Sequence, residues 1–401
     1  MEGDLIHINE WLLPLSWLYG LGVGTRNTLF DVGVLKSRAY DVPIISVGNI
    51  TVGGTGKTPH VEYLIQLLRD KCRVAVLSRG YKRKSHGYLL ADEDTPMQMI
   101  GDEPFQMKRK YPDVSVAVDK KRTRGIERLT TDPQTCDTDV ILLDDAFQHR
   151  YVKPGINILL VDYHRLVIYD RLLPAGRLRE PQKAKNRADI VIVTKCPRSL
   201  KPMEYRVLTK ALSLYPYQRL FFTTFAYDRP QPLFSAPPLT LDAVVASPHL
   251  LMVTGIGSPR HMENDLRQMA IDRHGGDTAA APIITHLSFS DHHNFSRRDI
   301  AKINNVYAGL PADTVAVTTE KDAARLRHCD GLSPQLMAHL YVLPIKVQFM
   351  LDQEETFNEN IIGYVRKNSR NSILAQGKDD HSSRDRHHPG NRPRTISFRD
   401  N

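Results

Sequence analysis

A glycine-rich segment between an apolar run and a helical pattern limits the possible folds of this chain more than any other feature. Residues 46–59 read SVGNITVGGTGKTP, which matches the phosphate-binding pattern G-x-x-x-x-G-K-[ST] except that Thr51 stands at its first glycine. Glycines let backbone N–H groups curl around phosphate oxygens, and the helix that follows directs the positive end of its dipole at them. The strand-like run before the loop and the helical stripe after it favour a nucleotide site over an incidental glycine turn.

The residues of this loop have separate expected tasks. The Lys57 ammonium group would neutralise the β- and γ-phosphates, and the Thr58 hydroxyl would bind Mg²⁺. The loop therefore predicts a nucleotide and Mg²⁺ as cofactors. The backbone around the phosphates would come from Thr51, Val52, Gly53, Gly54, Thr55 and Gly56.

Short apolar runs alternate with helical patterns along the first half of the chain. Most of these runs are continuous rather than alternating, which is typical of strands covered on both faces. This indicates a doubly wound, mostly parallel α/β sheet that carries the phosphate loop. The strand candidates are 42–48, 73–78, 114–118, 139–144, 156–162 and 189–194.

A second, shorter series of strand and helix patterns follows a segment rich in proline and aromatic residues. Ser296 followed by Asp299 predicts a capping box at the start of one of its helices. The strand candidates of this smaller α/β domain are 250–255, 282–289, 314–319 and 340–345. The predicted organisation is an N-terminal helical segment (1–40), a nucleotide-binding domain (41–215), a linker (216–248), a smaller α/β domain (249–366) and a basic, disordered tail (367–401).

Two adjacent carboxylates end the strand candidate at 139–144. The sequence DVILLDDAFQHR places Asp144 and Asp145 where a nucleotide site needs an anchor for Mg²⁺. Neighbouring residues at a strand end point in different directions, so one carboxylate can hold the metal while the other orients a basic group. The alternative is a polar turn in which an aspartate caps the next helix.

Other polar motifs are weaker when each is taken by itself. Asp102 and Glu103 precede a predicted helix, where capping is the simplest explanation. Asp291, His292 and His293 form a cluster, but a histidine pair without further ligands is more often a surface or packing feature than a metal site. The segments LSRGYKRK, LLPAGRLREP and TTEKDAARL lie at or near the carboxyl ends of strand candidates, where α/β sheets bind ligands.

The net charge and the cysteines of the chain indicate which kinds of partner it binds and in which compartment it works. The chain has 54 Lys+Arg against 45 Asp+Glu, a net charge of +9 that suits anionic partners such as nucleotides, phospholipid surfaces or nucleic acid. Its cysteines are scattered singly, without the spacing of a zinc site, which fits a reducing cytoplasm.

The N-terminal segment Trp11–Gly24 is apolar but too short to cross a bilayer, which takes about 20 residues. It predicts either a helix in a membrane interface, with its two tryptophans as anchors, or a helix packed on the domain core. Composition alone favours the core. A helix opened by Pro14 would have one face formed by Leu15, Leu18, Tyr19 and Gly22.

In their order and number, these motifs closely resemble the tetraacyldisaccharide 4'-kinase family, the lipid A 4'-kinases of Gram-negative bacteria. The set, within residues 11–366, is SVGNITVGGTGKTP, LSRGYKR, GDEP, DDAFQHR, LLPAGRLREP, TGIGSP, DHHNF and TTEKDAARL. In that family the first loop position is commonly Ser or Thr, so Thr51 fits. The resemblance implies ATP-dependent phosphorylation of the 4'-hydroxyl of tetraacyldisaccharide 1-phosphate, which gives lipid IVA, at the cytoplasmic face of the bacterial inner membrane.

The resemblance also implies roles for residues that the motifs alone do not assign. Arg179 and Glu180 of LREP would face the nucleotide and the metal. Asp102 of GDEP and His292 would form the catalytic dyad. A second histidine, His293, follows, and only the motif assigns the role to His292 rather than to His293. The implied partners are ATP and a lipid substrate at the membrane surface, without nucleic acid, and the N-terminal segment becomes the candidate for peripheral attachment.

Two other functions compete with this interpretation. A P-loop GTPase or metallochaperone-like regulator should offer a guanine-reading N-K-x-D segment, but VTKCP at 193–197 lacks the Asn and the Asp. A nucleotide-gated membrane adaptor without catalytic activity would leave GDEP and DHHNF without a task.

Overall fold

The computed structural model describes residues 8–256, 259–291 and 293–368, and the chain divides into two compact units. The first contains the chain up to Phe225 and from Val347 onward, and the second is Ala226–Lys346. The tail predicted as disordered lies outside the described residues from 369 onward. No helix of the described residues is long and apolar enough to cross a membrane.

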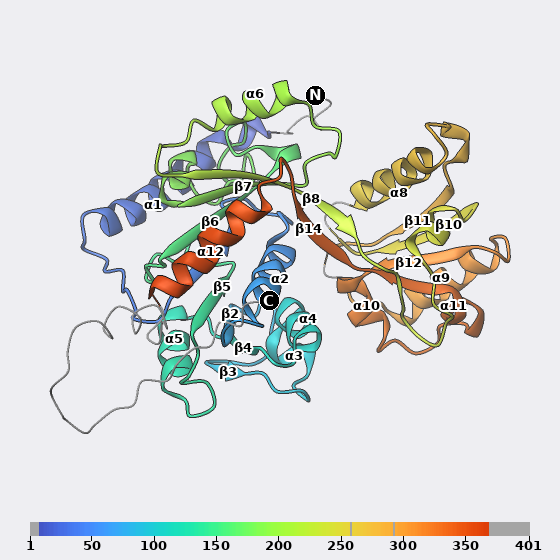
Figure 1. Ribbon diagram of the computed structural model, residues 1–401, viewed down its shortest axis with the longest axis horizontal. Coiled ribbons are helices and arrows are strands. Elements are labelled where there is room, and N and C mark those ends of the chain that lie inside the picture. The colour runs from blue at the N-terminus through green and yellow to red at the C-terminus, as the bar shows by residue number, and fades with distance from the viewer. Residues whose placement is uncertain (1–7, 257–258, 292, 369–401) are drawn as a thin grey trace, which may run out of the picture. The chain divides into compact units, whose positions relative to one another are not determined.

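A nine-stranded sheet forms the centre of the first unit (Figure 1). Its strands are β1 (Ile44–Gly48), β2 (Val74–Ser78), β3 (Leu89–Leu90), β4 (Ser115–Val118), β5 (Val140–Asp144), β6 (Ile156–Asp162), β7 (Ile190–Thr194), β8 (Arg219–Tyr227) and β14 (Ile345–Phe349). The spatial order is β14-β8-β7-β6-β1-β5-β2-β4-β3, and the strands from β8 to β4 pair in parallel. The six predicted strands and the parallel, doubly wound sheet are confirmed.

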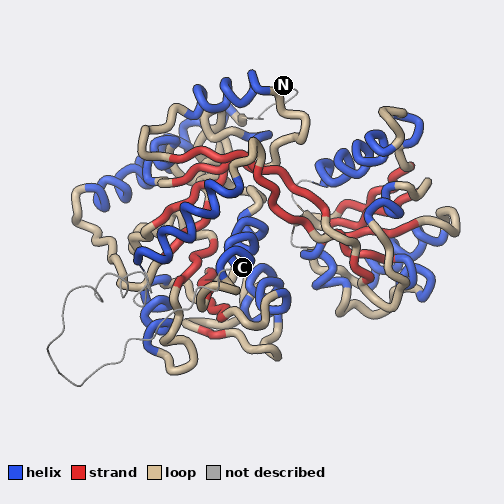
Figure 2. Tube along the Cα trace, in the orientation of Figure 1, coloured by secondary structure: helices blue, strands red, loops and turns tan. Residues whose placement is uncertain are grey.

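Helices cover both faces of this sheet (Figure 2). They are α2 (Lys57–Leu68), α3 (Met97–Ile100), α4 (Asp102–Lys110), α5 (Arg122–Thr131), α6 (Pro202–Leu212) and α12 (Glu354–Asn368). Alternate strand residues face opposite layers, so Val76 packs in the core with α2, α4 and α12, whereas Leu77 packs with Ile126 and Leu129 of α5. Burial on both faces explains why the strand sequences are continuously apolar.

The C-terminal part of the chain returns to the first unit. The predicted smaller domain runs to residue 366, but β14 joins the edge of the large sheet beside β8, and α12 packs on that sheet. The reason is an apolar stripe of Phe357, Ile361 and Val365, which is buried in the same core as Phe221. The segment predicted as a linker likewise begins with β8, a strand of the large sheet.

The second unit has its own five-stranded sheet, in the order β11-β10-β12-β13-β9. The strands are β9 (Gln231–Pro232), β10 (His249–Thr254), β11 (Ile283–Ser288), β12 (Val315–Thr319) and β13 (Leu340–Leu343). The helices are α7 (Leu241–Val245), α8 (Pro259–Arg273), α9 (Arg297–Ala308), α10 (Glu320–Leu326) and α11 (Pro334–His339). The predicted capping box is present, because Ser296 and Asp299 exchange hydrogen bonds at the start of α9.

The N-terminal helix α1 (Leu13–Asp31) separates a polar inner side from an apolar outer side. On the inner side, Ser16 Oγ donates to the Leu172 carbonyl at 3.0 Å, and the Tyr19 hydroxyl donates to the Arg179 carbonyl at 2.9 Å. Of the predicted face, Tyr19 therefore uses its hydroxyl to dock the helix, whereas Leu15 and Leu18 are exposed. The outer side exposes Leu15, Trp17, Leu18 and Leu21, and Trp11 of the preceding 3₁₀ turn (Glu10–Leu12) is exposed as well.

Candidate active site

The phosphate loop joins β1 to α2 and depends on glycine at two positions. Gly53 has φ 120° and Gly56 has φ 83°, conformations that L-residues with side chains rarely adopt. The buried Asn49 amide donates to Thr55 Oγ1 at 2.9 Å and lies 3.4 Å from Thr51 Oγ1. A hydroxyl residue at the first glycine position thus belongs to the polar core of the loop rather than marking a defect in it.

A second backbone segment pairs with the loop and carries the LREP motif to it. Val52 N donates to Arg177 O at 2.8 Å, and Arg179 N donates to Ile50 O at 2.7 Å. These bonds place the Arg179 side chain beside the loop. The motif LLPAGRLREP therefore pairs with the phosphate loop through backbone hydrogen bonds. Sequence analysis could only locate this motif near a strand end.

Asp144 is a buried carboxylate at the carboxyl end of β5, directly beside β1. Ser78 Oγ donates to its Oδ2 at 2.9 Å, and Arg122 Nη2 donates to its backbone carbonyl at 2.9 Å. Burial, reinforced by the charges of Glu103 and Asp145, raises the pKa of Asp144 to about 7. Its Oδ1 is buried and has no hydrogen-bond partner.

That unpartnered oxygen bears on whether Mg²⁺ fits this site. No group of three or more His, Cys, Asp or Glu side chains in the described part of the chain could hold a metal ion. Mg²⁺ at nucleotide sites needs only one or two protein oxygens, because phosphates and water supply the others. A buried carboxylate oxygen without a donor, beside a phosphate loop, suits such an ion.

Asp145, the second aspartate of the pair, adopts a left-handed backbone conformation with φ 47°. Lys57 Nζ lies 3.6 Å from its Oδ1, and Arg179 Nη1 lies 3.8 Å from its Oδ2. The structure therefore joins three predicted site residues, Lys57, Asp145 and Arg179, in one charged cluster. The expectation that one aspartate of the pair orients a basic group matches this geometry.

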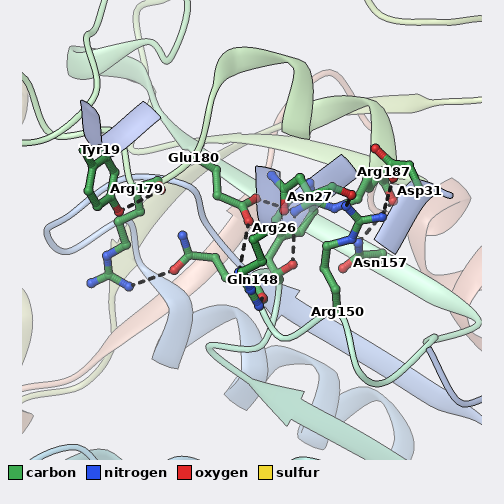
Figure 3. Close-up of polar contacts among 11 residues, drawn as sticks. Tyr19, Arg26, Asn27, Asp31, Gln148, Arg150, Asn157, Arg179, Glu180 and Arg187 are labelled. Carbon is green, nitrogen blue, oxygen red and sulfur yellow. Dashed lines mark hydrogen bonds and ion pairs between the residues drawn. The ribbon is translucent and has the colours of Figure 1, made fainter. Parts of the chain in front are cut away.

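Glu180, by contrast, is engaged in a buried ion-pair network (Figure 3). Its carboxylate is 1% exposed and pairs with Arg187 through one oxygen, while Arg26 Nη1 lies 3.9 Å from the other. Arg26 also donates to the Gln148 backbone carbonyl at 3.0 Å. Through this network and Tyr19, α1 is fastened to the segments that carry the site.

A polar cavity of about 330 Å³ lies next to the charged cluster. Its lining includes Tyr19 of α1, so the N-terminal helix forms part of its wall. The cavity is lined by Tyr19, Ser78, Arg79, Tyr81, Glu103, Asp145, Gln148, Leu173 and Arg179. Arg79 and Tyr81 belong to the RGY motif, which sequence analysis noted without assigning a role.

Asp102 is the first residue of α4, one position before the cavity-lining Glu103. Gly101 precedes it with φ 92°, and a Cβ there would lie 2.9 Å from the Tyr81 carbonyl. This close approach sets the start of α4 against the RGY turn. His292 lies outside the described residues, so its pairing with Asp102 stays a prediction.

Sequence reasoning missed Ser78 and Arg122, which hold Asp144 from β2 and α5. Their contacts depend on strand order, since β2 lies beside β5 in space but far from it along the chain. A buried arginine gives no signal in a sequence. The serine ending the run VAVLS was the only hint, as a polar residue at a strand's carboxyl end.

A family model for tetraacyldisaccharide-1-phosphate 4'-kinases matches residues 8–366. The chain belongs to this family. The family predicted from the motifs is therefore confirmed, and the match spans both structural units. The GTPase-like regulator and the adaptor are thereby set aside.

Relatives of this family member include proteins named tetraacyldisaccharide 4'-kinase from several bacteria. The protein from Phocaeicola vulgatus is 56% identical over 93% of this chain and 99% of its own length. The one from Bacteroides thetaiotaomicron is 50% identical over 96% and 100%, respectively. A solved structure of LpxK from Aquifex aeolicus in complex with ATP matches with a TM-score of 0.64 and 30% identity, over 88% of this chain and 98% of that one.

Proposed function

We propose that this protein, like its named relatives, is an ATP-dependent kinase that phosphorylates the 4'-hydroxyl of tetraacyldisaccharide 1-phosphate to form lipid IVA. The observation that carries the proposal is the shared position of Asp145. It pairs with Lys57 of the phosphate loop and also lines the polar cavity, so donor and acceptor sites adjoin there.

On the donor side, the N–H groups of the loop and Lys57 bind the phosphates of ATP. Thr58 and Asp144 would hold Mg²⁺, which offsets negative charge on the transferring phosphoryl group. Asp145 lies beside Lys57, which would meet the γ-phosphate, and Arg179 approaches the same carboxylate from the LREP segment. Preorganised cations at this point stabilise the charge of the transition state without reorganisation.

On the acceptor side, Asp102 would accept the proton of the sugar hydroxyl. A sugar hydroxyl becomes acidic only late in a loose phosphoryl-transfer transition state, so a carboxylate is a sufficient base. His292 would orient that carboxylate. Arg79 and Arg179 in the cavity wall supply positive charge for a phosphorylated sugar.

The outer side of α1 would dock the enzyme peripherally on the cytoplasmic face of the inner membrane. Trp17 is 73% exposed and Leu21 is 70% exposed, and their neighbours on this side are also apolar. Aromatic and aliphatic side chains gathered on one side of a helix favour a lipid interface over water. Tyr19 links this helix to the cavity, so the docking element and the acceptor site are parts of one structure.

One assay tests the proposal: purified protein with Mg·ATP and tetraacyldisaccharide 1-phosphate in mixed micelles, followed by mass spectrometry of the lipid. We expect one added phosphate on the disaccharide. Phosphate released only to water would refute the kinase function.

The dyad is tested separately with Asp102→Ala, His292→Ala and the matched control His293→Ala. The first two should lower kcat by about 100-fold or more, the scale of general acid–base catalysis, with little change in ATP binding. If His293→Ala is the damaging change instead, the motif assignment is off by one residue.

A further inference from the structure

A buried histidine directly after the phosphate loop connects the loop to a distant strand of the sheet. His60 lies in the first turn of α2 and is 3% exposed. Its Nδ1 is 2.7 Å from the Gly56 carbonyl oxygen, and its Nε2 is 3.1 Å from Thr223 Oγ1 on β8. Two strands, β7 and β6, lie between β8 and β1 in the sheet, so this contact joins the loop after β1 to a strand that is not its neighbour.

The chemistry of the two partners determines which nitrogen carries the proton. A carbonyl oxygen only accepts hydrogen bonds, so Nδ1 must be the N–H donor to Gly56. In the neutral ring Nε2 then has the lone pair, and the Thr223 hydroxyl donates to it. Both ring nitrogens thus have a hydrogen-bond partner. We call this chain of two hydrogen bonds, from the Gly56 carbonyl through His60 to Thr223, the brace.

The brace acts on the peptide group that precedes Lys57. The Gly56 carbonyl and the Lys57 N–H belong to one planar trans peptide and point in opposite directions. Holding the carbonyl toward His60 therefore directs the Lys57 N–H to the opposite side, where the loop receives phosphate. Gly56 is also confined by Phe225, because a Cβ would lie 2.7 Å from that ring.

The preceding peptide group is held in the same manner from the neighbouring strand. Thr194 Oγ1 on β7 donates to the Thr55 carbonyl at 3.0 Å. The same planarity then fixes the direction of the Gly56 N–H. Two consecutive N–H groups of the loop are therefore oriented, one by Thr194 of β7 and one by His60, which Thr223 of β8 holds in turn.

We propose that His60 and Thr223 are positioning residues for ATP: they hold the phosphate loop in its binding conformation through the Gly56 carbonyl. This inference rests on the proposed use of ATP as phosphate donor. It assigns a task to the proline- and aromatic-rich segment after residue 216, which the motifs left without one. His60 and Thr223 therefore act on ATP through the loop.

The test compares Thr223→Val, which removes the hydroxyl at nearly constant volume, with Thr224→Val. Thr224 is the next residue of β8, and neighbouring strand residues point to opposite faces. Calorimetric titration of the full-length protein with Mg·ATP, without lipid, gives Kd. We expect Thr223→Val and His60→Leu each to raise Kd about tenfold, the effect of losing a buried hydrogen bond. Thr224→Val should leave Kd within about twofold of the original protein.

Conservative variants separate positioning from packing. Thr223→Ser keeps a donor for Nε2, and the amide of His60→Asn can donate to the Gly56 carbonyl, so both should restore most of the affinity. In lipid phosphorylation, Thr223→Val should raise the KM for ATP more than it lowers kcat. The double variant His60→Leu/Thr223→Val should bind ATP no more weakly than His60→Leu alone. Thr223 acts only through His60, so its loss has no further effect once His60 is replaced.

The inference is overturned if folded Thr223→Val, verified by circular dichroism, binds Mg·ATP as tightly as the original protein. It is also overturned if Thr224→Val weakens binding equally, since packing of β8 would then be the cause. Because the titration contains no acceptor, its result is independent of the lipid assay. ATP binding that depends on Thr223 in a protein that phosphorylates no lipid would refute the proposed function and leave the brace intact.

Discussion

Replacing the buried Asp144 by asparagine should abolish catalysis and yet stabilise the metal-free protein above neutral pH. Folding raises the pKa of this carboxyl from 3.8 to about 7, chiefly because the group is buried. A raised folded-state pKa means that the folded protein holds the proton more tightly than the unfolded chain. The resulting loss of stability is absent below pH 4, grows as pH rises, and is complete above pH 7.

The magnitude follows from the pKa difference of about three pH units, each equivalent to about 1.4 kcal/mol. Ionised Asp144 therefore lowers the free energy of unfolding by about 4 kcal/mol at pH 8, and by less than half of that at pH 5. Asparagine removes this term, and Ser78 can still donate to its amide oxygen. Its unpartnered NH₂ group costs about 1 to 3 kcal/mol at both pH values.

The quantity to measure is therefore how the difference in free energy of unfolding between Asp144→Asn and the original protein changes with pH. Relative to the original protein, Asp144→Asn should gain about 2 to 3 kcal/mol between pH 5 and pH 8. Urea denaturation followed by circular dichroism in EDTA measures it. Asp145→Asn is the comparison variant: it removes only the smaller contribution of the Asp145 charge to the raised pKa of Asp144, so its gain between pH 5 and pH 8 should be smaller. A variant effect of Asp144→Asn that is the same at both pH values would refute the reasoning.

Three further predictions concern other parts of the first unit. Trp17→Ser combined with Leu21→Ser should reduce sedimentation with anionic phospholipid vesicles several-fold while the Kd for Mg·ATP is unchanged; undiminished sedimentation would exclude the outer side of α1 as the docking surface. Gly56→Ala should lower the free energy of unfolding by about 1 to 2 kcal/mol, because alanine is strained at φ 83°; an unaltered urea midpoint would contradict this. Glu180→Gln should cost about 1 to 2 kcal/mol, since the buried side chain loses its ion pairs with the partly exposed Arg187 and Arg26. Stable Glu180→Gln protein with weakened Mg²⁺ dependence would instead support the role on the metal side that the family resemblance implies.

The elements predicted from the sequence are those whose signal is local. Continuous apolar runs such as VILLD identified the buried strands, and the glycine spacing identified the loop, because both depend on neighbours in the chain. The acidic pair was located for the same reason. Asp145 then met Lys57, as expected from the parallel arrangement of β1 and β5.

What could not be predicted depends on contacts between segments far apart in sequence. The partner of His60 lies on β8, 163 residues further along the chain, in a stretch whose prolines and aromatic residues suggested a linker. The return of α12 to the first unit could not be predicted for the same reason. An apolar stripe shows that one face of a helix is buried, but it does not show which part of the chain covers that face. For Glu180, the sequence motif could not show that the carboxylate is buried or that Arg187 and Arg26 pair with it.

The two-sided construction of α1 has a consequence for the kinetics of the enzyme. Removing acyl chains from a bilayer costs about 0.8 kcal/mol for each CH₂ group, so a tetraacylated substrate does not leave the membrane during catalysis. With Tyr19 in the cavity wall and the exposed Trp17 on the other side of the same helix, the proposed docking through α1 would require only the sugar to enter the protein. The reaction would then take place in two dimensions. Its rate should follow the mole fraction of substrate in the surface, and adding inert lipid at constant bulk substrate concentration should slow it.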